Sequence, residues 1–332
     1  MWGIALALVL LLADSPLELF RNALDALAHG DYSAAEKGFQ QVLRDVPNHP
    51  GAMLNLGVVY SRTGRYDEAI AQYRAVLKSN LAEKSALANL AIALVKKQDY
   101  ADALPVFQKL AALNPTSAAL RDPDLLYQFA SAYLRRDRTD AARQSVAALL
   151  SGAAGDYVSC RLAFDAGHFD EAESACRQSL AEGGTFPGLH TALGKVLVSE
   201  HSPDAAKELS LAIAQDPKDP EAQYSMGVAL LDDGQPSAAA PYLERAMELD
   251  PSFWGTYFYL GRAKLDLGQP ADAVPLLRQA AEKNPRAATV FYELGRALIS
   301  AGKPAEAKQA MQRVRELRAQ ELETDAQALR KH

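Results

Sequence analysis

The 332-residue sequence lacks the short motifs that hold phosphates, catalytic metals or activated serines. It contains no glycine-rich phosphate loop, no HExxH pair, no GxSxG elbow and no Cys-x-x-Cys pair. Its histidines are scattered, and the two that share a local segment, His190 and His201, are spaced poorly for joint coordination of a metal ion. The sequence therefore predicts no enzymatic activity, no cofactor and no metal site.

An excess of one charge sign is also missing. The chain has 35 basic and 41 acidic residues, a net charge of −6 and no long run of either sign. This balance gives no general attraction to nucleic acid or to anionic lipid. With 49% hydrophobic and 23% charged residues, the chain is typical of a folded protein and too apolar for a disordered one. We therefore expect a large buried core and no nucleic-acid partner.

Long apolar runs are absent except at the N-terminus. Residues 2–12 are all apolar or small, and Ala13 is followed by the polar residues Asp14 and Ser15. The run is far shorter than the ~20 residues that a membrane-spanning helix needs, and it resembles the hydrophobic segment of a secretory signal. Residues 1–13 are therefore predicted to be a signal peptide. The mature protein would then be periplasmic or secreted and would have no stable membrane span.

Two features oppose export. No Lys or Arg precedes the apolar run, and Leu11 is a poor residue close to the cleavage point. The alternative is a buried first helix or a misassigned start, which would leave the protein in the cytoplasm. In either case Ser15, Pro16 and Glu18 form a capping-box pattern, so a helix is expected to begin at Pro16.

The sequence is rich in self-similarity. Alanine recurs in one register, mostly at 34-residue intervals, and a second small residue lies twelve positions before it (eleven in one case). The alanines are Ala35, Ala69, Ala103, Ala142, Ala172, Ala205, Ala239, Ala273 and Ala307. The preceding small residues are Ala23, Gly57, Ala91, Ala130, Cys160, Gly194, Gly227, Gly261 and Gly295. Small side chains at both positions allow two antiparallel helices to approach closely.

Glycine and proline mark the ends of the predicted helices. Between the two small positions lie the glycines Gly30, Gly64, Gly167, Gly234, Gly268 and Gly302. Glycine readily adopts the left-handed conformation that ends a helix. In three late repeats a proline follows two residues later, at Pro236, Pro270 and Pro304, where it suits the first turn of a second helix. Each repeat is thus predicted to be a helix–turn–helix unit.

The spacing of the alanines is irregular in one region. Ala103 and Ala142 are 39 residues apart, whereas Ala142 and Ala172 are 30 apart. The extra residues fall around 118–122, and the deficit falls around 151–155. The predicted order is repeats 1–3 at residues 16–117, an irregular connection at 118–122, repeats 4–9 at 123–321, and a polar C-terminal capping helix extension and tail at 322–332.

These repeats resemble the tetratricopeptide repeat family from residue 16 to about residue 321. In the segment Pro220–Phe253 the typical residues are Gly227, Gly234, Ala239, Leu243, Ala246 and Pro251. The resemblance implies an all-α fold, a right-handed superhelical solenoid of antiparallel helix pairs. It also implies a non-catalytic scaffold that binds peptide segments of a partner protein in a concave groove.

In that family the first helix of each repeat lines the groove, and the fifth and ninth positions point inward. This sequence places aromatic and basic residues there: Tyr127, Tyr157, Arg161, Lys195, Tyr224, Phe258, Arg262, Tyr292 and Arg296. Residues four positions apart share a helix face, which pairs Tyr157 with Arg161, Phe258 with Arg262, and Tyr292 with Arg296. Such a groove suits an acidic or aromatic peptide segment. Alternatively, the tyrosines only pack between repeats and each arginine covers its neighbour.

The two cysteines, Cys160 and Cys176, belong to the two helices of one repeat. Antiparallel packing brings them near each other, and in an exported protein such a pair permits a disulfide. The alternative is two small buried cysteines, because Cys160 occupies a position that requires a small residue.

Two other functions fit the same repeats. The first is a cytoplasmic regulatory or assembly adaptor, which the N-terminal run would distinguish from an exported scaffold. The second is a non-catalytic subunit of an enzyme complex. An enzyme is disfavoured because the repeats use nearly every residue and leave no catalytic domain.

Overall fold

The computed structural model describes residues 15–79 and 83–329, and within these ranges the chain contains α-helices and one short 3-10 helix but no strand. The expected all-α class and the antiparallel helix pairs are confirmed. The predicted signal peptide, residues 1–13, lies outside the described residues. No described helix is both long enough and apolar enough to span a bilayer.

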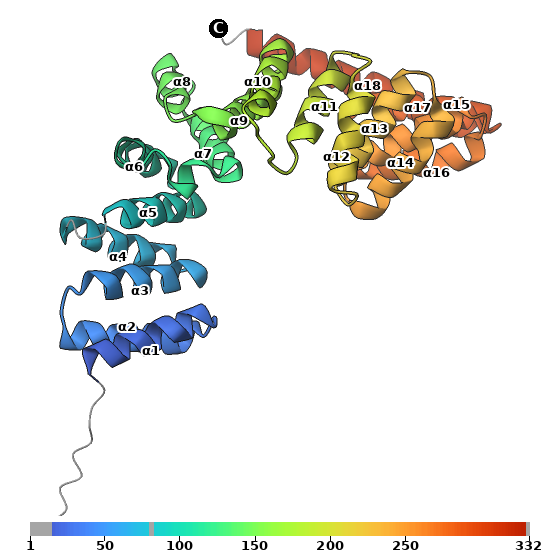
Figure 1. Cartoon of the computed structure of the whole chain (residues 1–332). Helices are drawn as coiled ribbons and strands as arrows, with labels where there is room; N and C mark the ends of the chain where they lie inside the picture. Colours follow the sequence, from blue (N-terminus) through green and yellow to red (C-terminus); the bar gives the residue numbers. More distant parts are fainter. Residues whose placement is uncertain (1–14, 80–82, 330–332) are drawn as a thin grey trace, which may run out of the picture. The chain divides into compact units, whose positions relative to one another are not determined.

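The helices follow one another as pairs (Figure 1). Repeats 1–4 contain α1 (Pro16–Ala28), α2 (Tyr32–Asp45), α3 (Pro50–Arg62), α4 (Tyr66–Ser79), α5 (Glu83–Lys97), α6 (Tyr100–Leu113), α7 (Pro123–Arg136) and α8 (Asp140–Ala147). Repeats 5–7 contain α9 (Gly152–Asp165), α10 (Phe169–Ala181), α11 (Leu189–Ser199), α12 (Ala205–Gln215), α13 (Pro220–Asp232) and α14 (Pro236–Leu249). Repeats 8 and 9 contain α15 (Trp254–Asp266), α16 (Pro270–Lys283), α17 (Ala288–Ser300) and α18 (Pro304–Leu329).

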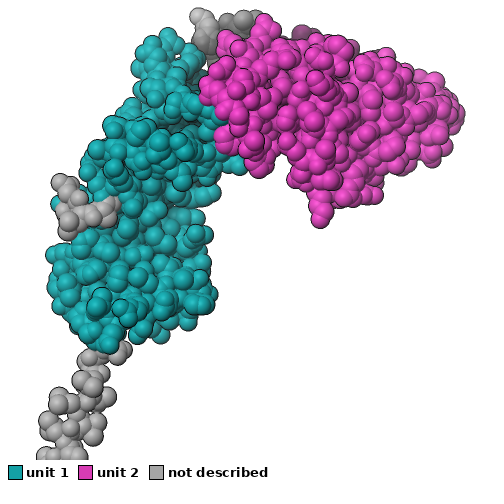
Figure 2. Space-filling view, viewed as in Figure 1, with its two compact units in different colours: residues 1–158 teal, residues 159–332 magenta. Residues whose placement is uncertain are grey.

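The chain divides into two compact units, residues 1–158 and 159–332 (Figure 2). Within the first unit, α3 packs against α4 and also contacts the first helices of the neighbouring repeats, α1 and α5. In the second unit, α13 packs against α14 in the same way and contacts α11 and α15. First helices therefore form a continuous layer inside each unit, as stacked repeats require.

The helix ends follow the chemistry expected from the sequence. Ser15 and Glu18 form the predicted capping box: the Ser15 hydroxyl accepts from the Glu18 amide, and the Glu18 carboxylate accepts from the Ser15 amide at 2.9 Å. All six turn glycines have positive φ, between 70° and 78°. The three prolines predicted to open second helices are the first residues of α14, α16 and α18.

The small residues allow the two helices of a repeat to touch. All nine register alanines are buried, with at most 4% of their surface exposed. A Cβ added at Gly227 would lie 2.4 Å from Cγ of Leu243, and one at Gly261 would lie 2.7 Å from Cγ of Leu277. A side chain at either position would collide with the leucine that the second helix presents opposite it, so these two first helices need glycine there. We call this pair of positions the small–large contact.

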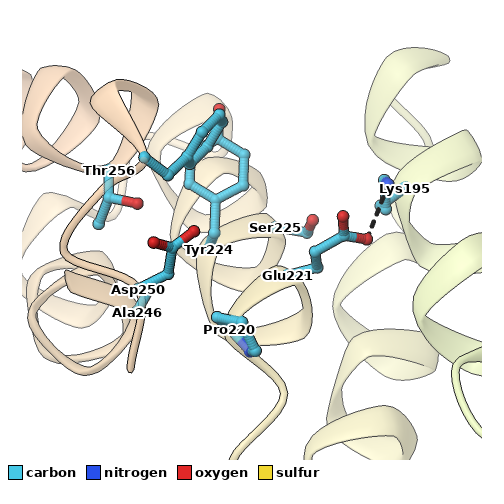
Figure 3. A pocket seen from close by; sticks show the side chains of 9 residues that line it. Lys195, Pro220, Glu221, Tyr224, Ser225, Ala246, Asp250 and Thr256 are labelled. Carbon is cyan, nitrogen blue, oxygen red and sulfur yellow. Dashed lines mark hydrogen bonds and ion pairs between the residues drawn. The ribbon is translucent and has the colours of Figure 1, made fainter. Parts of the chain in front are cut away.

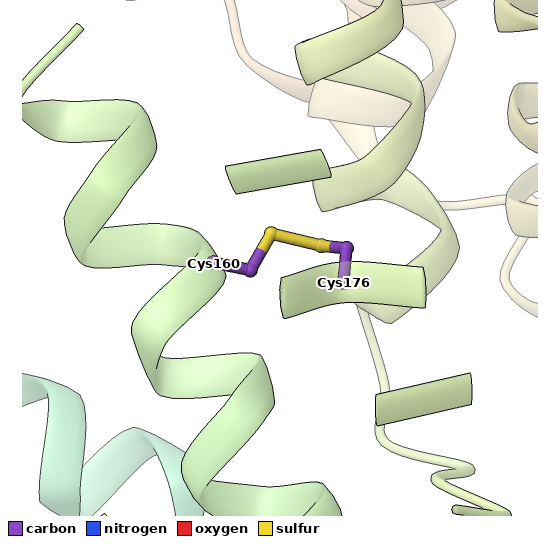
Figure 4. The surroundings of a disulfide bond; sticks show 2 residues. All are labelled: Cys160 and Cys176. Carbon is purple, nitrogen blue, oxygen red and sulfur yellow. A yellow bond between two sulfur atoms is a disulfide. The ribbon is translucent and has the colours of Figure 1, made fainter. Parts of the chain in front are cut away.

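In repeat 5 the small–large contact is covalent. Cys160 and Cys176 occupy its two positions, both are fully buried, and a disulfide joins α9 to α10 with the two Cα atoms 5.1 Å apart (Figure 4). The disulfide closes the loop of chain between Cys160 and Cys176. A closed loop of this size restricts the unfolded chain, which stabilises the fold by about 3 kcal/mol in the chain-entropy model. The bridge thus replaces side-chain packing in a repeat that follows the shortest second helix, α8, which has eight residues.

The irregular spacing of the alanines coincides with local features of the chain. The segment 118–122 contains the 3-10 helix η1 (Ala118–Leu120), and α18 continues to Leu329, within the segment predicted as an extension. The boundary between the two compact units along the chain falls within α9 and not at 118–122. The assignment of 16–117 and 123–321 as separate sets of repeats stays a prediction.

Replacing Gly261 by leucine should destabilise the second unit, because the new side chain would overlap Leu277. We expect the free energy of unfolding, measured by urea denaturation, to fall by about 1 to 3 kcal/mol. Leu277→Ala alone leaves a cavity and should cost about 2 to 5 kcal/mol. In the double variant the introduced leucine fills that cavity, so the combined loss should be smaller than the sum of the two. Additive losses would contradict the small–large contact.

Candidate functional site

Five aromatic side chains of repeats 7 and 8 contact one another in a closed ring. Tyr224 of α13 lies edge-on to Phe253, with ring centroids 5.0 Å apart, and to Tyr259, at 5.6 Å. Tyr259 contacts Phe258 at 5.0 Å, Phe258 contacts Trp254 at 6.0 Å, and Trp254 contacts Phe253 at 6.3 Å. Four of the five come from residues 253–259, a stretch that begins one residue before α15. We call these residues the aromatic cluster.

A cavity of about 200 Å³ opens beside the aromatic cluster (Figure 3). It is built from the first helices of three consecutive repeats and from the end of α14. Its lining residues are Lys195 of α11, Pro220, Glu221, Tyr224 and Ser225 of α13, Ala246 and Asp250 at the end of α14, and Phe253 and Thr256 around the start of α15. Phe253 is 39% exposed although it is large and apolar, so the cavity offers an aromatic surface to an incoming group.

The charges around the cavity are partly compensated. Lys195 Nζ donates to Glu221 Oε2 at 2.9 Å, and the same ammonium lies 5.2 Å from the ring centroid of Phe164. Asp250 accepts from the Ser252 hydroxyl at 2.6 Å and from its amide at 2.9 Å. These hydrogen bonds lower the pKa of Asp250, so its carboxylate stays ionised near neutral pH. The lining therefore carries two carboxylates and one ammonium group.

Tyr224 belongs both to the cavity lining and to the aromatic cluster, as Phe253 does. It is half-buried, and burial is the main reason why its pKa is raised; the neighbouring Tyr259 phenol raises the pKa further. The Tyr224 phenol therefore remains protonated well above neutral pH. It contributes an apolar ring and a neutral hydroxyl rather than a charge.

Arg262 borders the aromatic cluster on α15. Its guanidinium carbon lies 5.4 Å from the ring centroid of Tyr259 and 5.9 Å from that of Phe258, which places a cation on two aromatic faces. Among the described residues it forms no ion pair. Arg262 can therefore donate hydrogen bonds to a carboxylate without giving up an existing salt bridge.

The structure brings together four of the nine predicted groove residues: Lys195, Tyr224, Phe258 and Arg262. Phe258 and Arg262, which are predicted to share a helix face, lie close enough for the guanidinium group to contact the ring. Further along, Tyr292 is 45% exposed on α17, and Arg296 is paired with Glu293 at 2.7 Å.

The other three predicted residues lie on the first helices of repeats 4 and 5. Tyr127 of α7 and Arg161 of α9 are half-buried, and Tyr157 of α9 is buried with 5% exposed. Burial of Tyr157 fits the packing alternative better than a groove position. A role in binding for any of the nine residues stays a prediction.

Sequence reasoning missed Phe253, Trp254 and Tyr259, and the acidic lining residues Glu221 and Asp250. A signal was present, because residues 253–259 contain five aromatics in seven positions. The prediction considered only the fifth and ninth positions of each repeat. It therefore left out residues that lie before the first helix and residues that lie one position away from the expected face. Among the described residues, no group of three or more His, Cys, Asp or Glu side chains is placed to hold a metal ion.

Consecutive helix pairs, each held by a small–large contact, define a helical-repeat protein. Comparison of the sequence with models of protein families identifies the type of repeat. Two family models described as Tetratricopeptide repeat match the chain, one at residues 20–80, 59–118 and 259–321, the other at 94–158 and 230–274. The chain belongs to the tetratricopeptide repeat family. Members of this family generally bind protein partners and are generally non-catalytic scaffolds.

Solved structures resemble the chain in fold alone. A tetratricopeptide repeat protein from Parabacteroides merdae is 17% identical, and the match covers 85% of this chain and 98% of that one, with a TM-score of 0.44. MamA from Desulfovibrio magneticus is 20% identical, and the match covers 52% of this chain and 98% of that one, with a TM-score of 0.45. A search of curated proteins found no significant match.

Alkaline pH should destabilise the second unit in part through Tyr224. Because the pKa of this phenol is raised above its unfolded value of about 10, the unfolded chain loses the proton first. The stabilising contribution is fully present below about pH 10 and is lost as the pH rises toward the folded-state pKa. Tyr224→Phe cannot ionise, so it should lose less stability between about pH 9 and 11 than the wild type in urea denaturation.

The matched control is Tyr292→Phe, which removes an exposed phenol outside the aromatic cluster. It should keep the pH dependence of the wild type. If Tyr224→Phe also keeps the pH dependence of the wild type, ionisation of the Tyr224 phenol does not contribute to the loss of stability at alkaline pH.

Proposed function

We propose that this scaffold binds an extended peptide segment of a partner protein on the first helices of repeats 6 to 8, outside the cytoplasm. The observation that supports the site is the cavity of about 200 Å³ beside the aromatic cluster, with Phe253 exposed at its edge. Partly exposed aromatic residues around a pocket are typical of the positions that dominate binding energy at protein interfaces. The role is non-catalytic binding.

The lining favours an aromatic or large apolar side chain inside the cavity. Tyr224 and Phe253 present ring faces and edges, and an added ring in an edge-to-face arrangement gains about 0.5 to 1.5 kcal/mol beyond the area it buries. Glu221 and Asp250 repel a carboxylate at the same place. An acidic side chain therefore does not serve as the anchor.

Acidic residues of the segment have a separate partner in Arg262. Its guanidinium is held on two aromatic rings and can form a bidentate pair with a carboxylate. Lys195 is less suited to this task, because it already pairs with Glu221. The proposed ligand thus combines an aromatic anchor with an acidic residue outside the cavity.

Two observations support a location outside the cytoplasm. The structure contains a disulfide between Cys160 and Cys176, and such bonds persist in oxidising compartments. The sequence begins with an apolar run that resembles an export signal. A cytoplasmic regulatory or assembly adaptor is the alternative, and it is favoured by the lack of a basic residue before that run.

The binding site can be tested with a peptide selected from a random library against the full chain. We expect Phe253→Ala and Arg262→Gln each to weaken binding about tenfold or more, equivalent to about 1.4 kcal/mol, in fluorescence anisotropy titrations. Tyr292→Ala and Arg296→Gln are matched controls, since they remove an exposed aromatic residue and a basic residue from the next first helix.

These controls should bind the peptide as the wild type does, and thermal melts should show that all four variants are folded. If the controls weaken binding as much as the two site variants, the cavity is not the site. If none of the four matters, the peptide binds away from the first helices of repeats 7 to 9.

The location can be tested on protein recovered from cells that express the full chain. We expect intact-mass analysis to show a chain that begins at Asp14, and both cysteines to resist alkylation until a reductant is added. A chain that keeps residues 1–13 and has two freely alkylated cysteines would support the cytoplasmic adaptor instead.

A further inference from the structure

A second cavity, of about 320 Å³, lies in the first unit between α3, α4 and α5. Its size is at the lower end of the range of about 300 to 1,000 Å³ that is typical of small-ligand sites. Part of its wall is apolar, formed by Val58 of α3 and by Ile92 and Ala93 of α5. This cavity shares no residue with the one in the second unit.

The only charged residues in the lining are two cations, Arg62 and Lys96. They are equivalent in the repeat, since each follows the small residue of its first helix by five positions, Gly57 in one case and Ala91 in the other. Both are exposed, and neither forms an ion pair with any residue that the structure describes. The adjacent Lys97, by contrast, pairs with Asp67 at 2.5 Å. Two uncompensated positive charges at the edge of an apolar cavity favour an anion.

The cavity also has a hydroxyl that the packing of the repeat does not require. Tyr73 is the large residue of the small–large contact in repeat 2; it is 1% exposed and packs against Gly57. Its phenol oxygen lies 3.1 Å from the Ser61 hydroxyl, and both residues line the cavity. The equivalent residues of the other eight repeats lack a hydroxyl: Phe39, Phe107, Val146, Cys176, Leu209, Leu243, Leu277 and Met311. Phenylalanine would therefore satisfy the packing, and the hydroxyl of Tyr73 is a polar group of a residue that lines the cavity.

We propose that this cavity binds a monocarboxylate with an apolar body. The carboxylate is held by Arg62 and Lys96, the apolar body lies against Val58 and Ile92, and the hydroxyls of Tyr73 and Ser61 fix its orientation. A free small organic acid and the last residue of a peptide both present this chemistry. The site is independent of the peptide site in the second unit.

Ligand-observed NMR titrations of the full chain test the proposal with two matched pairs of probes. Hexanoate and hexanamide represent the free acid, and N-acetylphenylalanine and its amide represent a peptide end. We expect at least one carboxylate to bind and its neutral amide to bind about tenfold more weakly or not at all. The tighter of the two acids identifies the source of the carboxylate.

Variants assign the binding to the cavity. The double variant Arg62→Gln/Lys96→Gln should weaken carboxylate binding about tenfold or more. The control Lys37→Gln/Lys84→Gln removes the same charge from exposed residues of the first unit outside the cavity and should leave binding unchanged. Tyr73→Phe should weaken binding several-fold, and a thermal melt should show that the variant is folded at the temperature of the titration.

Three results would overturn the proposal. The first is no binding of either acid up to about 10 mM. The second is equal binding of each acid and its amide, which would show that the charge is not recognised. The third is equal affinity of the cavity variant and the charge-matched control, which would place the binding elsewhere.

Discussion

In eight of the nine repeats a small residue on the first helix faces a larger residue on the second helix, and in repeat 5 two cysteines occupy these positions. The rest of the structure depends on this contact. Its geometry leaves no room for a Cβ at Gly227 or Gly261. Helices of about 13 residues are marginal alone and are stabilised by packing. The contact fixes how closely each pair packs, and therefore which faces remain for the neighbouring repeats and for ligands. The disulfide between Cys160 and Cys176 is the same contact in covalent form.

Because packing uses a fixed set of positions, the other positions of the first helices can differ between the units. Five residues after the small residue, repeats 2 to 4 carry Arg62, Lys96 and Arg135, whereas repeats 5, 7 and 8 carry Asp165, Asp232 and Asp266. The first unit thus presents cations beside its cavity, and the second presents an aromatic cluster beside a cavity lined by Glu221 and Asp250. The two units are built by one packing rule and offer different chemistry to ligands.

The periodicity of the sequence was sufficient to predict the fold, because alanine allows close packing of helices, glycine ends a helix and proline begins one. The same periodicity was less informative about the residues of the candidate binding site. Phe258 and Arg262 were predicted because they occupy the fifth and ninth positions of the repeat, which point into the groove in the family that the sequence resembles, and the spacing of four residues paired them on one helix face. Phe253 and Asp250 were missed because they lie outside the first helix, and their approach to Tyr224 depends on how consecutive repeats stack. Tyr157 and Tyr292 occupy the same position of the repeat, yet one is buried and the other is 45% exposed.

We propose that second helices hold each repeat together while first helices of repeats 6 to 8 bind the partner. Hydrogen exchange followed by mass spectrometry, with and without a bound peptide ligand, tests this claim directly. We expect slower exchange on binding in α11, α13 and α15, and little change in α12 and α16. Protection confined to second helices, or to the first unit, would contradict it.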